Sequence, residues 1–303
     1  MLVCSKKILQ IADKHGYAVG AFNTSNLEFT KAIIDAASEL NAPVIIQTSE
    51  KAIRYAGLKE IATIIQTIAK QSKIPVSLHL DHGKSINMVR DCIKNGYTSI
   101  MLDASDLPFQ QNIVMTKQAV KLAHPRVSVE AELGILAGVE DHVKGEKTIY
   151  TDPEQARKFV KLTKVDSLAI AIGTSHGAYK FKGKPKLDFK RLKEINEHVK
   201  IPLVLHGASS IPKQLVAQAN RFGAKIKNAH GVPDSEIRKA VKLGIRKVNE
   251  DTDLRLAFTA AIRKYLKTKK SDFDHRSILQ AATELIKKTV ISRIKILGSA
   301  NKA

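Results

Sequence analysis

The sequence Ser77-Leu78-His79-Leu80-Asp81-His82-Gly83 joins an apolar run to a cluster of groups that bind protons and metal ions. A buried strand that ends in polar residues is how a β/α barrel presents its chemistry, at the carboxyl ends of its strands. Two later apolar runs end in the same way, at Gly173-Thr174-Ser175-His176-Gly177 and at His206-Gly207-Ala208-Ser209-Ser210. We therefore predict that these three segments meet at one rim of a barrel.

The remainder of the sequence alternates short apolar runs with longer amphipathic ones. Eight such pairs, without a linker rich in Pro, Ser or Gly, predict an α/β fold: a (β/α)8 TIM barrel in one domain of residues 1–303. We expect a leading N-terminal helix over residues 2–15 and extra C-terminal helices over 254–267 and 277–297. A doubly wound open sheet is the alternative, which the lack of G-x-G-x-x-G after the first expected strand disfavours.

Other segments give local expectations. Residues 136–151 form a long, charged connection with glycines, and long loops in a compact domain often act as lids. Asp152-Pro153 predicts the start of a helix, with Asp as the N-cap and Pro at the first helical position. Residues 212–231 and 233–243 are expected to form two helical pieces before the last strand.

Composition limits the compartment and the partners. The 303 residues include no run of about 18 apolar residues, as a membrane span requires. The first 13 residues lack a signal core and a cleavage site. Cys4 and Cys92 cannot form a disulfide framework and lack metal-binding spacing. We therefore expect a cytoplasmic protein that has no membrane partner.

The net charge of +21 has two explanations. One is a partner with several negative charges, such as a phosphorylated metabolite or nucleic acid. The other is a lysine-rich surface without a specific partner. The basic residues are spread from Lys6 to Lys302 rather than gathered in an arm, which favours the second explanation for most of them.

Three imidazoles follow the third, sixth and seventh expected strands: His82, His176 and His206. They can converge across the mouth of the barrel, where they suit Zn²⁺ or a similar divalent ion with one position open for substrate. One histidine alone is more often a capped or merely satisfied polar residue, but the repeated placement favours a metal. His79 is expected deeper in its strand, where it packs or supports a metal ligand.

Carboxylates lie at the same strand ends. Asp81 can act as general acid/base on a hydroxyl of a bound substrate, or orient a histidine ligand. Asp103 and Glu132 can bind a second metal ion or orient the histidines, and the sequence leaves both options open. Glu140, in the long connection, is a candidate base that loop closure could bring to the site, although a solvated charge is the commoner fate of a loop glutamate.

Small residues and hydroxyls follow the sixth, seventh and eighth expected strands. Backbone N–H groups in such loops can bind an anion, and the last two loops are the usual phosphate site of a barrel. Ordinary turn formation explains the same residues. The segments are Gly173-Thr174-Ser175-His176-Gly177, Gly207-Ala208-Ser209-Ser210 and Asn249-Glu250-Asp251-Thr252.

Over nearly its whole length the chain resembles the class II, metal-dependent fructose-bisphosphate aldolase family. Residues 206–253 resemble the subgroup that has an extra helical segment before the last strand. The motifs behind the resemblance are Asp81-His82-Gly83, Glu130-Ala131-Glu132-Leu133-Gly134, Gly173-Thr174-Ser175-His176-Gly177, Leu205-His206-Gly207-Ala208-Ser209 and Gly298-Ser299-Ala300.

The resemblance implies reversible cleavage of fructose 1,6-bisphosphate to dihydroxyacetone phosphate and glyceraldehyde 3-phosphate, in glycolysis and gluconeogenesis. It implies acid/base action by Asp81 on the C4 hydroxyl, and removal of the triose-phosphate proton by Glu140. It further implies catalytic zinc on the three histidines and a second divalent ion at two carboxylates. These proposed metal ligands are His82, His176 and His206, with Asp103 and Glu132 at the second position.

The resemblance also implies a substrate pocket, a homodimer or homotetramer, and a monovalent cation that orders the phosphate loops. The substrate-binding positions are Asn23, Ser49, Gly177, Gly207, Ala208, Ser209, Asn249, Asp251 and Thr252. Glu250 departs from the family pattern, which commonly has an apolar residue there, and is expected to add negative charge near a phosphate site. Ile135-Leu136-Ala137-Gly138 replaces a more glycine-rich loop, which bears on the motion of Glu140.

Two alternative functions remain from the sequence. The first is cleavage of tagatose 1,6-bisphosphate, which differs from the fructose compound at one stereocentre. The second, of a different class, is a basic nucleic-acid-binding protein on a barrel scaffold. Nucleic-acid binding would weaken steeply with salt and ignore chelators, whereas the aldolase would lose activity in EDTA and recover it with Zn²⁺.

Overall fold

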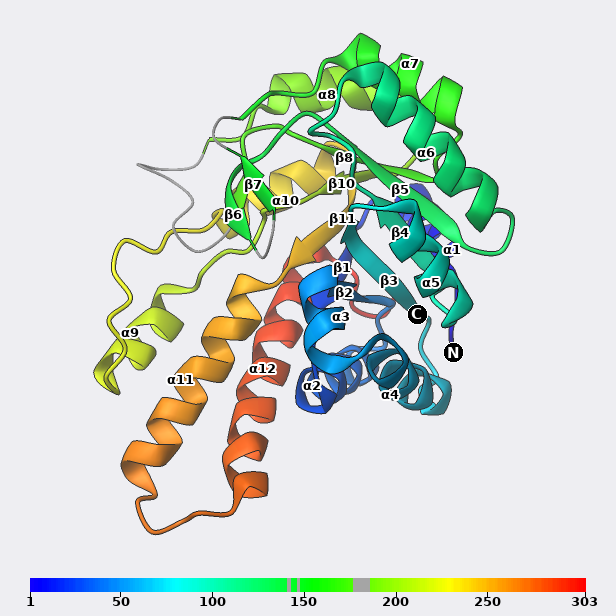
Figure 1. Ribbon diagram of the computed structural model, residues 1–303. Coiled ribbons are helices and arrows are strands. Elements are labelled where there is room, and N and C mark those ends of the chain that lie inside the picture. The colour runs from blue at the N-terminus through cyan, green and yellow to red at the C-terminus, as the bar shows by residue number, and fades with distance from the viewer. Residues whose placement is uncertain (141–142, 146–147, 177–185) are drawn as a thin grey trace.

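The computed structural model describes the backbone of residues 1–140, 143–145, 148–176 and 186–303 (Figure 1). Side chains are described for the same residues except 137–140, 143–145 and 176. Within this part of the chain, no helix combines the length and the apolar character that a membrane span needs.

Parallel strands close into a barrel, which confirms the predicted fold class. Each strand pairs with its neighbour in the order of the chain, and the last pairs with the first. The barrel strands are β1 (Val19–Asn23), β2 (Val44–Ser49), β3 (Val76–Gly83), β4 (Ser99–Leu102), β5 (Ser128–Leu133), β8 (Ser167–Ile170), β10 (Leu203–Leu205) and β11 (Ile245–Glu250).

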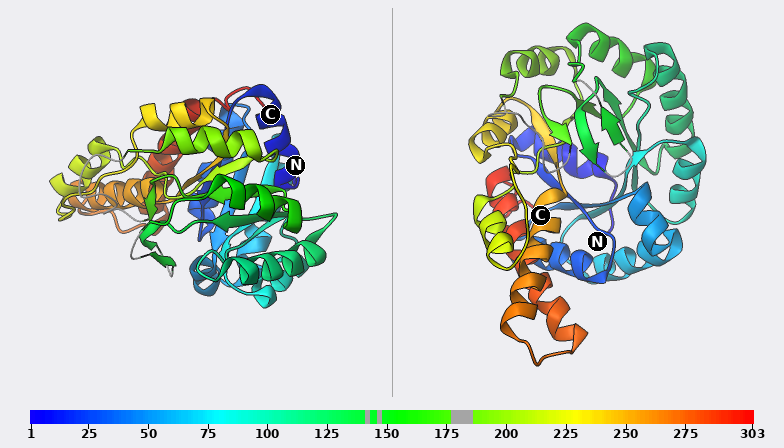
Figure 2. Two further views of the ribbon diagram at one scale, coloured as in Figure 1. Left: turned by 90° about the horizontal axis from the view of Figure 1, so that it is seen from above. Right: turned by 60° about the vertical axis from the view of Figure 1, so that its left-hand side comes forward.

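Helices surround this barrel (Figure 2), and the last two, α11 and α12, project from it as an antiparallel pair (Figure 1). Amphipathic helices between parallel strands bury the outer face of such a barrel, while side chains of the strands fill its interior. The helices are α1 (Ser5–His15), α2 (Leu27–Glu39), α3 (Glu50–Ala56), α4 (Leu58–Gln71), α5 (Ile86–Lys94), α6 (Phe109–Ala123), α7 (Pro153–Thr163), α8 (Phe189–His198), α9 (Lys213–Arg221), α10 (Asp234–Lys242), α11 (Thr252–Thr268) and α12 (His275–Leu297).

The interior of the barrel changes from apolar to polar along the strands. Near the amino ends, Val19, Ala21 and Ile45 pack against Ile8 and Leu9 of α1, so the leading helix covers this end. Nearer the carboxyl ends, the side chains that face inward are polar and form hydrogen bonds across the barrel. The functional groups are therefore confined to one rim.

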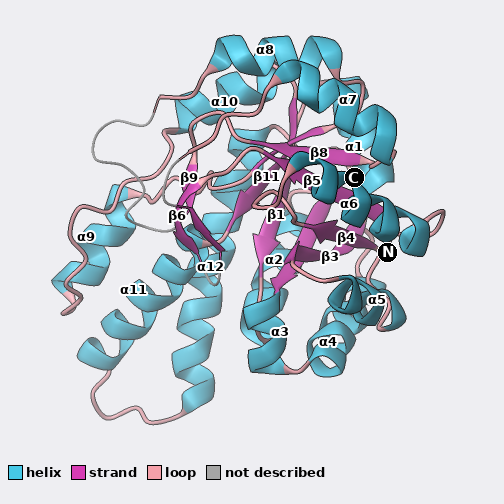
Figure 3. Cartoon of the chain, turned by 45° about the horizontal axis from the view of Figure 1, so that its top comes forward, coloured by secondary structure: helices cyan, strands magenta, loops and turns pink. Residues whose placement is uncertain are grey.

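A small sheet has the strand order β7–β6–β9, and Figure 3 shows its strands β6 and β9 beside the barrel. β6 (Ala137–Glu140) and β7 (Val143–Gly145) pair antiparallel, and β6 pairs in parallel with β9 (Ser175–His176). The connection that was expected to be a plain loop over residues 136–151 thus contains two strands. Its partner β9 follows barrel strand β8, which places the connection at the carboxyl-end rim of the barrel.

Some local expectations are confirmed and others are wrong. The Asp152 side chain accepts a hydrogen bond from the Gln155 N–H, with Pro153 as the first residue of α7, as predicted. The helix expected from residue 2 starts only at Ser5, because Leu2 pairs with Val76 in the bottom of the barrel. The short helix α3, which directly follows Ser49, was not expected.

Residues 222–231 are not helical, contrary to the expectation of a helix over 212–231. α9 ends at Arg221, and Gly223 then adopts a left-handed φ of +92°. The Asn220 side chain closes the turn by accepting from the Ile226 N–H and donating to the Ile226 carbonyl oxygen. Both features stop a helix, because left-handed backbone and side-chain bonds to the backbone replace its hydrogen bonds.

Candidate active site

The catalytic rim is centred on the end of β3. Asp81 and His82 are neighbours, so a regular strand would place them on opposite faces of the sheet. His82 instead has a left-handed φ of +48°, and the pairing of β3 with β4 shifts register between Leu80 and Gly83. This irregular end of the strand lets Asp81 and His82 belong to the same cluster of potential ligands.

His82 and His206 meet although 124 residues separate them. The His82 Nε2 and the His206 Nδ1 are 2.9 Å apart, and both side chains are buried. The other nitrogen of each ring forms a hydrogen bond with a carboxylate. His82 Nδ1 lies 2.8 Å from Asp103 Oδ2, and His206 Nε2 lies 2.8 Å from Glu130 Oε1. The two facing nitrogens are thus aimed at the same point.

This arrangement fits a metal ion. If each outer nitrogen donates to its carboxylate, two neutral rings would turn unshared electron pairs toward each other at 2.9 Å. A cation between the two nitrogens removes that repulsion. When no metal ion is bound, a proton on His82 has the same effect. Burial opposes the charge on His82, but Asp81, Asp103 and Glu132 outweigh it and raise its pKa to about 10. Metal binding would release this proton.

His206 remains the neutral partner. Burial lowers its pKa to about 4, helped by the positive charge of His82 and opposed by the hydrogen bond to Glu130. Neutral imidazole is the form that binds metal ions. Asp81, His82 and His206 offer ligand atoms within 4.8 Å of one another, as a metal site requires.

A second group of potential ligands shares His82 and adds Asp103 and Glu132, again within 4.8 Å. The Oε2 of Glu132 is buried and has no hydrogen-bond partner among the described residues. Burial, together with the Asp103 charge, raises the pKa of Glu132 to about 8. A buried carboxylate oxygen of this kind is a natural ligand for a cation. The structure thus brings together both carboxylates that the sequence singled out.

Asp81 is held by two amides. Its Oδ2 accepts from Asn23 Nδ2 at 2.9 Å, and its Oδ1 accepts from Asn249 Nδ2 at 3.0 Å. Burial raises the pKa of Asp81, but the positive charges of His82 and Lys247 and the hydrogen bond from Asn23 outweigh it, so the pKa lies below its usual value. The carboxylate is therefore ionised and fixed in position, as a proton acceptor must be.

A network of buried charged side chains contacts the histidines from the interior of the barrel. Lys247 Nζ lies 2.9 and 3.1 Å from the two carboxylate oxygens of Glu130, and 3.4 Å from His79 Nε2. The Lys247 and Glu130 side chains are almost fully buried. Lys247 keeps Glu130 ionised, and Glu130 in turn fixes the tautomer and orientation of His206.

This role of Glu130 and Lys247 was not predicted from the sequence. One signal could have revealed it: Glu130 and Glu132 are two residues apart on β5, as Lys247 and Asn249 are on β11, so each pair shares a face of its strand. His79 is confirmed as a buried support. Its Nδ1 lies 2.7 Å from Ser99 Oγ, and burial and Lys247 lower its pKa to about 3.

The loops after β10 and β11 contact each other at the rim. Ser209 Oγ accepts from the Asp251 N–H at 3.3 Å, and Ala208 is buried beside it. Gly207 has a φ of +60°, and a Cβ at this position would lie 2.6 Å from the Ser175 carbonyl oxygen. Glycine is therefore required there, because the loop after β8 passes directly over it.

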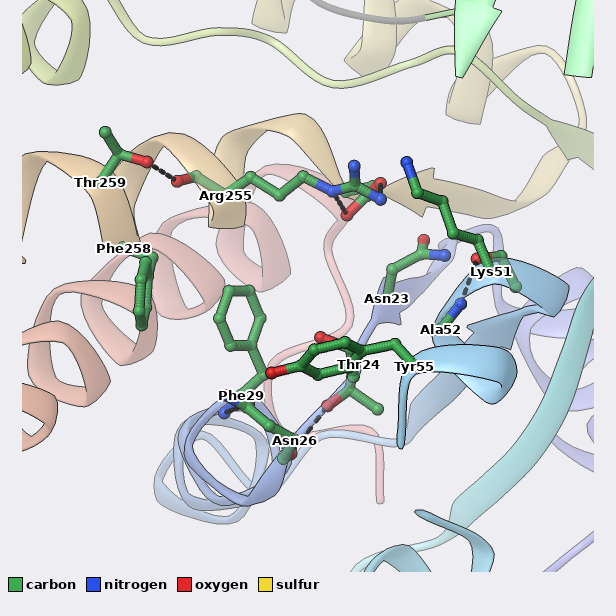
Figure 4. Close-up of a pocket in the computed structure, with 13 residues that line it drawn as sticks. Asn23, Thr24, Asn26, Phe29, Lys51, Ala52, Tyr55, Arg255, Phe258 and Thr259 are labelled. Atoms are coloured by element: carbon green, nitrogen blue, oxygen red, sulfur yellow. Dashed lines mark hydrogen bonds and ion pairs between the residues drawn. The ribbon is translucent and has the colours of Figure 1, made fainter. Parts of the chain in front are cut away.

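A pocket of about 410 Å³ lies at the rim between β1, β2 and the start of α11 (Figure 4). It includes Asn23, Ser49 and Asp251 from the predicted substrate positions. Ser49 also caps α3 by accepting from the Ala52 N–H, and Thr252 is the first residue of α11. The other polar residues of the lining were not predicted from the sequence; they are Thr24, Ser25, Asn26, Lys51, Tyr55, Arg255 and Thr259.

Some predicted residues cannot be placed in this site. Gly177 lies outside the described residues. The backbone of His176 lies in β9 and that of Glu140 in β6, but their side chains lie outside what the structure describes. The predicted third histidine ligand and the predicted loop base stay predictions.

The expectation for Glu250 is wrong. Its carboxylate does not add negative charge to the phosphate loops, because it alternates with the inward-facing Asn249 and points to the outside of the barrel. There the Glu250 Oε1 accepts from Arg293 Nε of α12 at 2.7 Å, and both side chains are almost completely buried. The same guanidinium also pairs with Asp234 and lies 4.0 Å from Asp253 Oδ2, so the Glu250 charge faces a cation that it shares with two other carboxylates.

Comparison with known proteins agrees with this geometry. The family model described as fructose-bisphosphate aldolase class-II matches residues 3–302. The chain belongs to this family. The fructose-bisphosphate aldolases of Thermus caldophilus and Helicobacter pylori strain 26695 are 47% and 48% identical to it, and each alignment covers 100% of both chains.

Solved structures of aldolases share the fold. The YdjI aldolase of Escherichia coli K12 superimposes with a TM-score of 0.83 at 33% identity, covering 100% of each chain. A putative fructose-1,6-biphosphate aldolase from Coccidioides immitis gives a TM-score of 0.82 at 27% identity, covering 98% of this chain and 97% of the other. As a class II aldolase the chain is an aldehyde-lyase of a metal-dependent family, and its histidine and carboxylate groups can hold a metal ion.

Proposed function

We propose that this class II aldolase cleaves fructose 1,6-bisphosphate reversibly to dihydroxyacetone phosphate and glyceraldehyde 3-phosphate. The observation that most supports this is the convergence of His82, His206 and Asp81 at one rim, with ligand atoms within 4.8 Å. A metal-binding group directly beside an ionised carboxylate is what aldol cleavage needs. The full-length relatives named fructose-bisphosphate aldolase support the same substrate.

We infer that the metal is zinc, held by His82, His206 and His176. When bound, zinc supplies a Lewis acid that draws electrons from the ketone of the sugar. Asp103 and Glu130 hold the outer nitrogens of His82 and His206, so the inner nitrogens stay directed at the ion. Asp103 and Glu132 are the proposed ligands of a second divalent ion, and a monovalent cation is proposed at the phosphate loops.

Two carboxylates are proposed to transfer the protons during cleavage and condensation. Asp81 is proposed to accept the C4 hydroxyl proton during cleavage and to return it during condensation, because its two amide partners fix it beside the histidines. Glu140 is proposed to exchange the proton of the triose phosphate, and its backbone in β6 pairs with the strand that contains His176.

Substrate binding is proposed for the residues that surround these groups. Backbone N–H groups in the loops after β8, β10 and β11 would bind one phosphate, since such loops are the usual anion site of a barrel. The pocket between β1, β2 and α11 would hold other parts of the sugar phosphate. The proposed substrate contacts are Asn23, Ser49, Gly177, Gly207, Ala208, Ser209, Asn249, Asp251 and Thr252.

Family membership favours the aldolase over the nucleic-acid-binding alternative, and tagatose 1,6-bisphosphate is not better supported than fructose 1,6-bisphosphate. We infer that the enzyme acts in the cytoplasm, in glycolysis and gluconeogenesis. A homodimer or homotetramer stays a prediction.

A coupled assay that detects glyceraldehyde 3-phosphate tests the proposal. We expect cleavage of fructose 1,6-bisphosphate to disappear after treatment with EDTA and removal of the chelator, and to return when Zn²⁺ is added. The tagatose compound should be cleaved at a lower kcat/KM. Borohydride added with substrate should trap nothing on the enzyme. Full activity in EDTA would contradict the metal requirement, and a covalent adduct on lysine would show a Schiff-base mechanism instead.

A further inference from the structure

Lys84 directly follows β3, and its side chain contacts one carboxylate of the second ligand group, that of Asp103. Lys84 Nζ lies 2.9 Å from Asp103 Oδ2 and 3.6 Å from Asp106 Oδ1. We propose that the Lys84 ammonium is a built-in cation at Asp103 that competes with a second divalent ion for the group of His82, Asp103 and Glu132. This inference rests on the proposed metal centre but concerns only its second position.

The hydrogen bonds of Asp103 show why the ammonium and a metal ion would compete. Its Oδ1 accepts from the N–H and the hydroxyl of Ser105 at 3.1 and 2.7 Å. Its Oδ2 accepts from His82 Nδ1 at 2.8 Å and contacts Lys84 Nζ. A divalent ion bound through Oδ2 would therefore have to take the place of the ammonium.

Lys84 is well placed to stay at this position. Its backbone N–H donates to Glu50 Oε1 at 2.8 Å, which fixes the start of the side chain. The side chain is 29% exposed, so it screens Asp103 from solvent while its far end can still move outward. The more exposed carboxylate of Asp106 is a second partner of the ammonium, at 3.6 Å.

Glu132 provides the independent sign that the position attracts a cation. Its Oε2 is buried, lies 3.7 Å from His82 Nδ1, and has no hydrogen-bond partner among the described residues. The ammonium pairs with Asp103 and Asp106, and the described part of the chain shows no ion pair between Lys84 and Glu132. Without Lys84, His82 would be the cation left beside Asp103 and Glu132 among the described residues.

The test counts metal ions bound per chain. We would dialyse the full chain against Co²⁺ at neutral pH and compare wild type with Lys84→Met, and with Lys84→Thr as a second variant in case the first folds poorly. Both variants should bind one more ion per chain than wild type, at a free Co²⁺ concentration at least tenfold below that at which wild type begins to take up this ion.

Two control variants complete the design. Lys84→Arg keeps a cation at the carboxylate, and Lys73→Met removes an exposed lysine before β3, at the other end of the strand. Both should bind Co²⁺ as wild type does. Equal uptake by Lys84→Met, Lys84→Thr and wild type would overturn the proposal, as would the same gain in Lys73→Met. Failure of the proposed metal centre would give a different result from failure of the Lys84 proposal. Wild type would then bind no ion at the histidines, whatever the difference in Co²⁺ uptake between the variants.

Discussion

Replacing His206 by alanine is expected to remove aldol cleavage together with bound zinc. His206 is 1% exposed and provides one of the two nitrogens that face each other at 2.9 Å. Its loss leaves the ion with a ligand set too small for a stable catalytic site, which normally uses three protein ligands. We expect activity to fall by more than the roughly 100-fold typical for a residue that only orients a ligand. Metal analysis after gel filtration and the coupled assay would measure both effects.

His124→Ala is the matched control. The His124 Nε2 also lies 2.8 Å from a buried carboxylate, Asp166 Oδ2, but Asp166 precedes β8 and so lies at the opposite end of the barrel. This variant should keep both zinc and activity. If His206→Ala retained zinc and wild-type cleavage, His206 would not be a ligand and the metal centre would have to be assigned elsewhere.

Asp81→Asn is expected to lower kcat by about 10²- to 10⁴-fold, the usual contribution of a general acid or base. The change keeps the shape of the side chain but removes its ability to accept the C4 hydroxyl proton. The amide introduced can still be accommodated, because Asn249 Oδ1 has no hydrogen-bond partner among the described residues and can accept from it after a flip. Stopped assays under saturating substrate would give kcat.

Zinc content separates the two possible roles of Asp81, since it belongs to the same ligand group as His82 and His206. A proton-transfer role predicts that Asp81→Asn keeps one zinc per chain. Loss of zinc along with activity would identify Asp81 as a metal ligand instead. Asp106→Asn, the same chemical change on an exposed carboxylate after β4, should leave kcat and zinc content unchanged.

The barrel and much of its rim could be predicted because they depend on local patterns. Apolar runs that end in His, Asp or Gly identify buried strands and their carboxyl ends without knowledge of the contacts. The contact between His82 and His206 follows from this rule, because parallel barrel strands bring their carboxyl ends together. The left-handed backbone of His82, in contrast, is not visible in the sequence, since few residues other than glycine adopt it.

The buried network was harder to predict because it depends on long-range pairing. Lys247 and Glu130 are 117 residues apart. Each lies inside an expected buried strand, where a charged side chain is unusual and its partner cannot be identified from the local sequence. Only the closed barrel shows that the two charges compensate each other. For the same reason Glu250 was misjudged: its partner Arg293 lies on a helix near the end of the chain.

The end of α9 and the helix α3 show a further limit. Residues 222–231 contain apolar side chains, but a turn closed by Asn220 and Gly223 overrides them. α3 has seven residues, too few to show a helical period, and its cap Ser49 resembles a strand-end binding residue. Short elements are decided by single hydrogen bonds rather than by repeated patterns.

Anomalous diffraction at the zinc absorption edge, from crystals of the active enzyme, tests the central claim most directly. The account predicts a strong peak within about 2.0–2.1 Å of both His82 Nε2 and His206 Nδ1, the usual zinc–nitrogen distance. A crystal of fully active enzyme with zinc bound elsewhere, or with these two nitrogens still in mutual contact and no peak beside them, would contradict it.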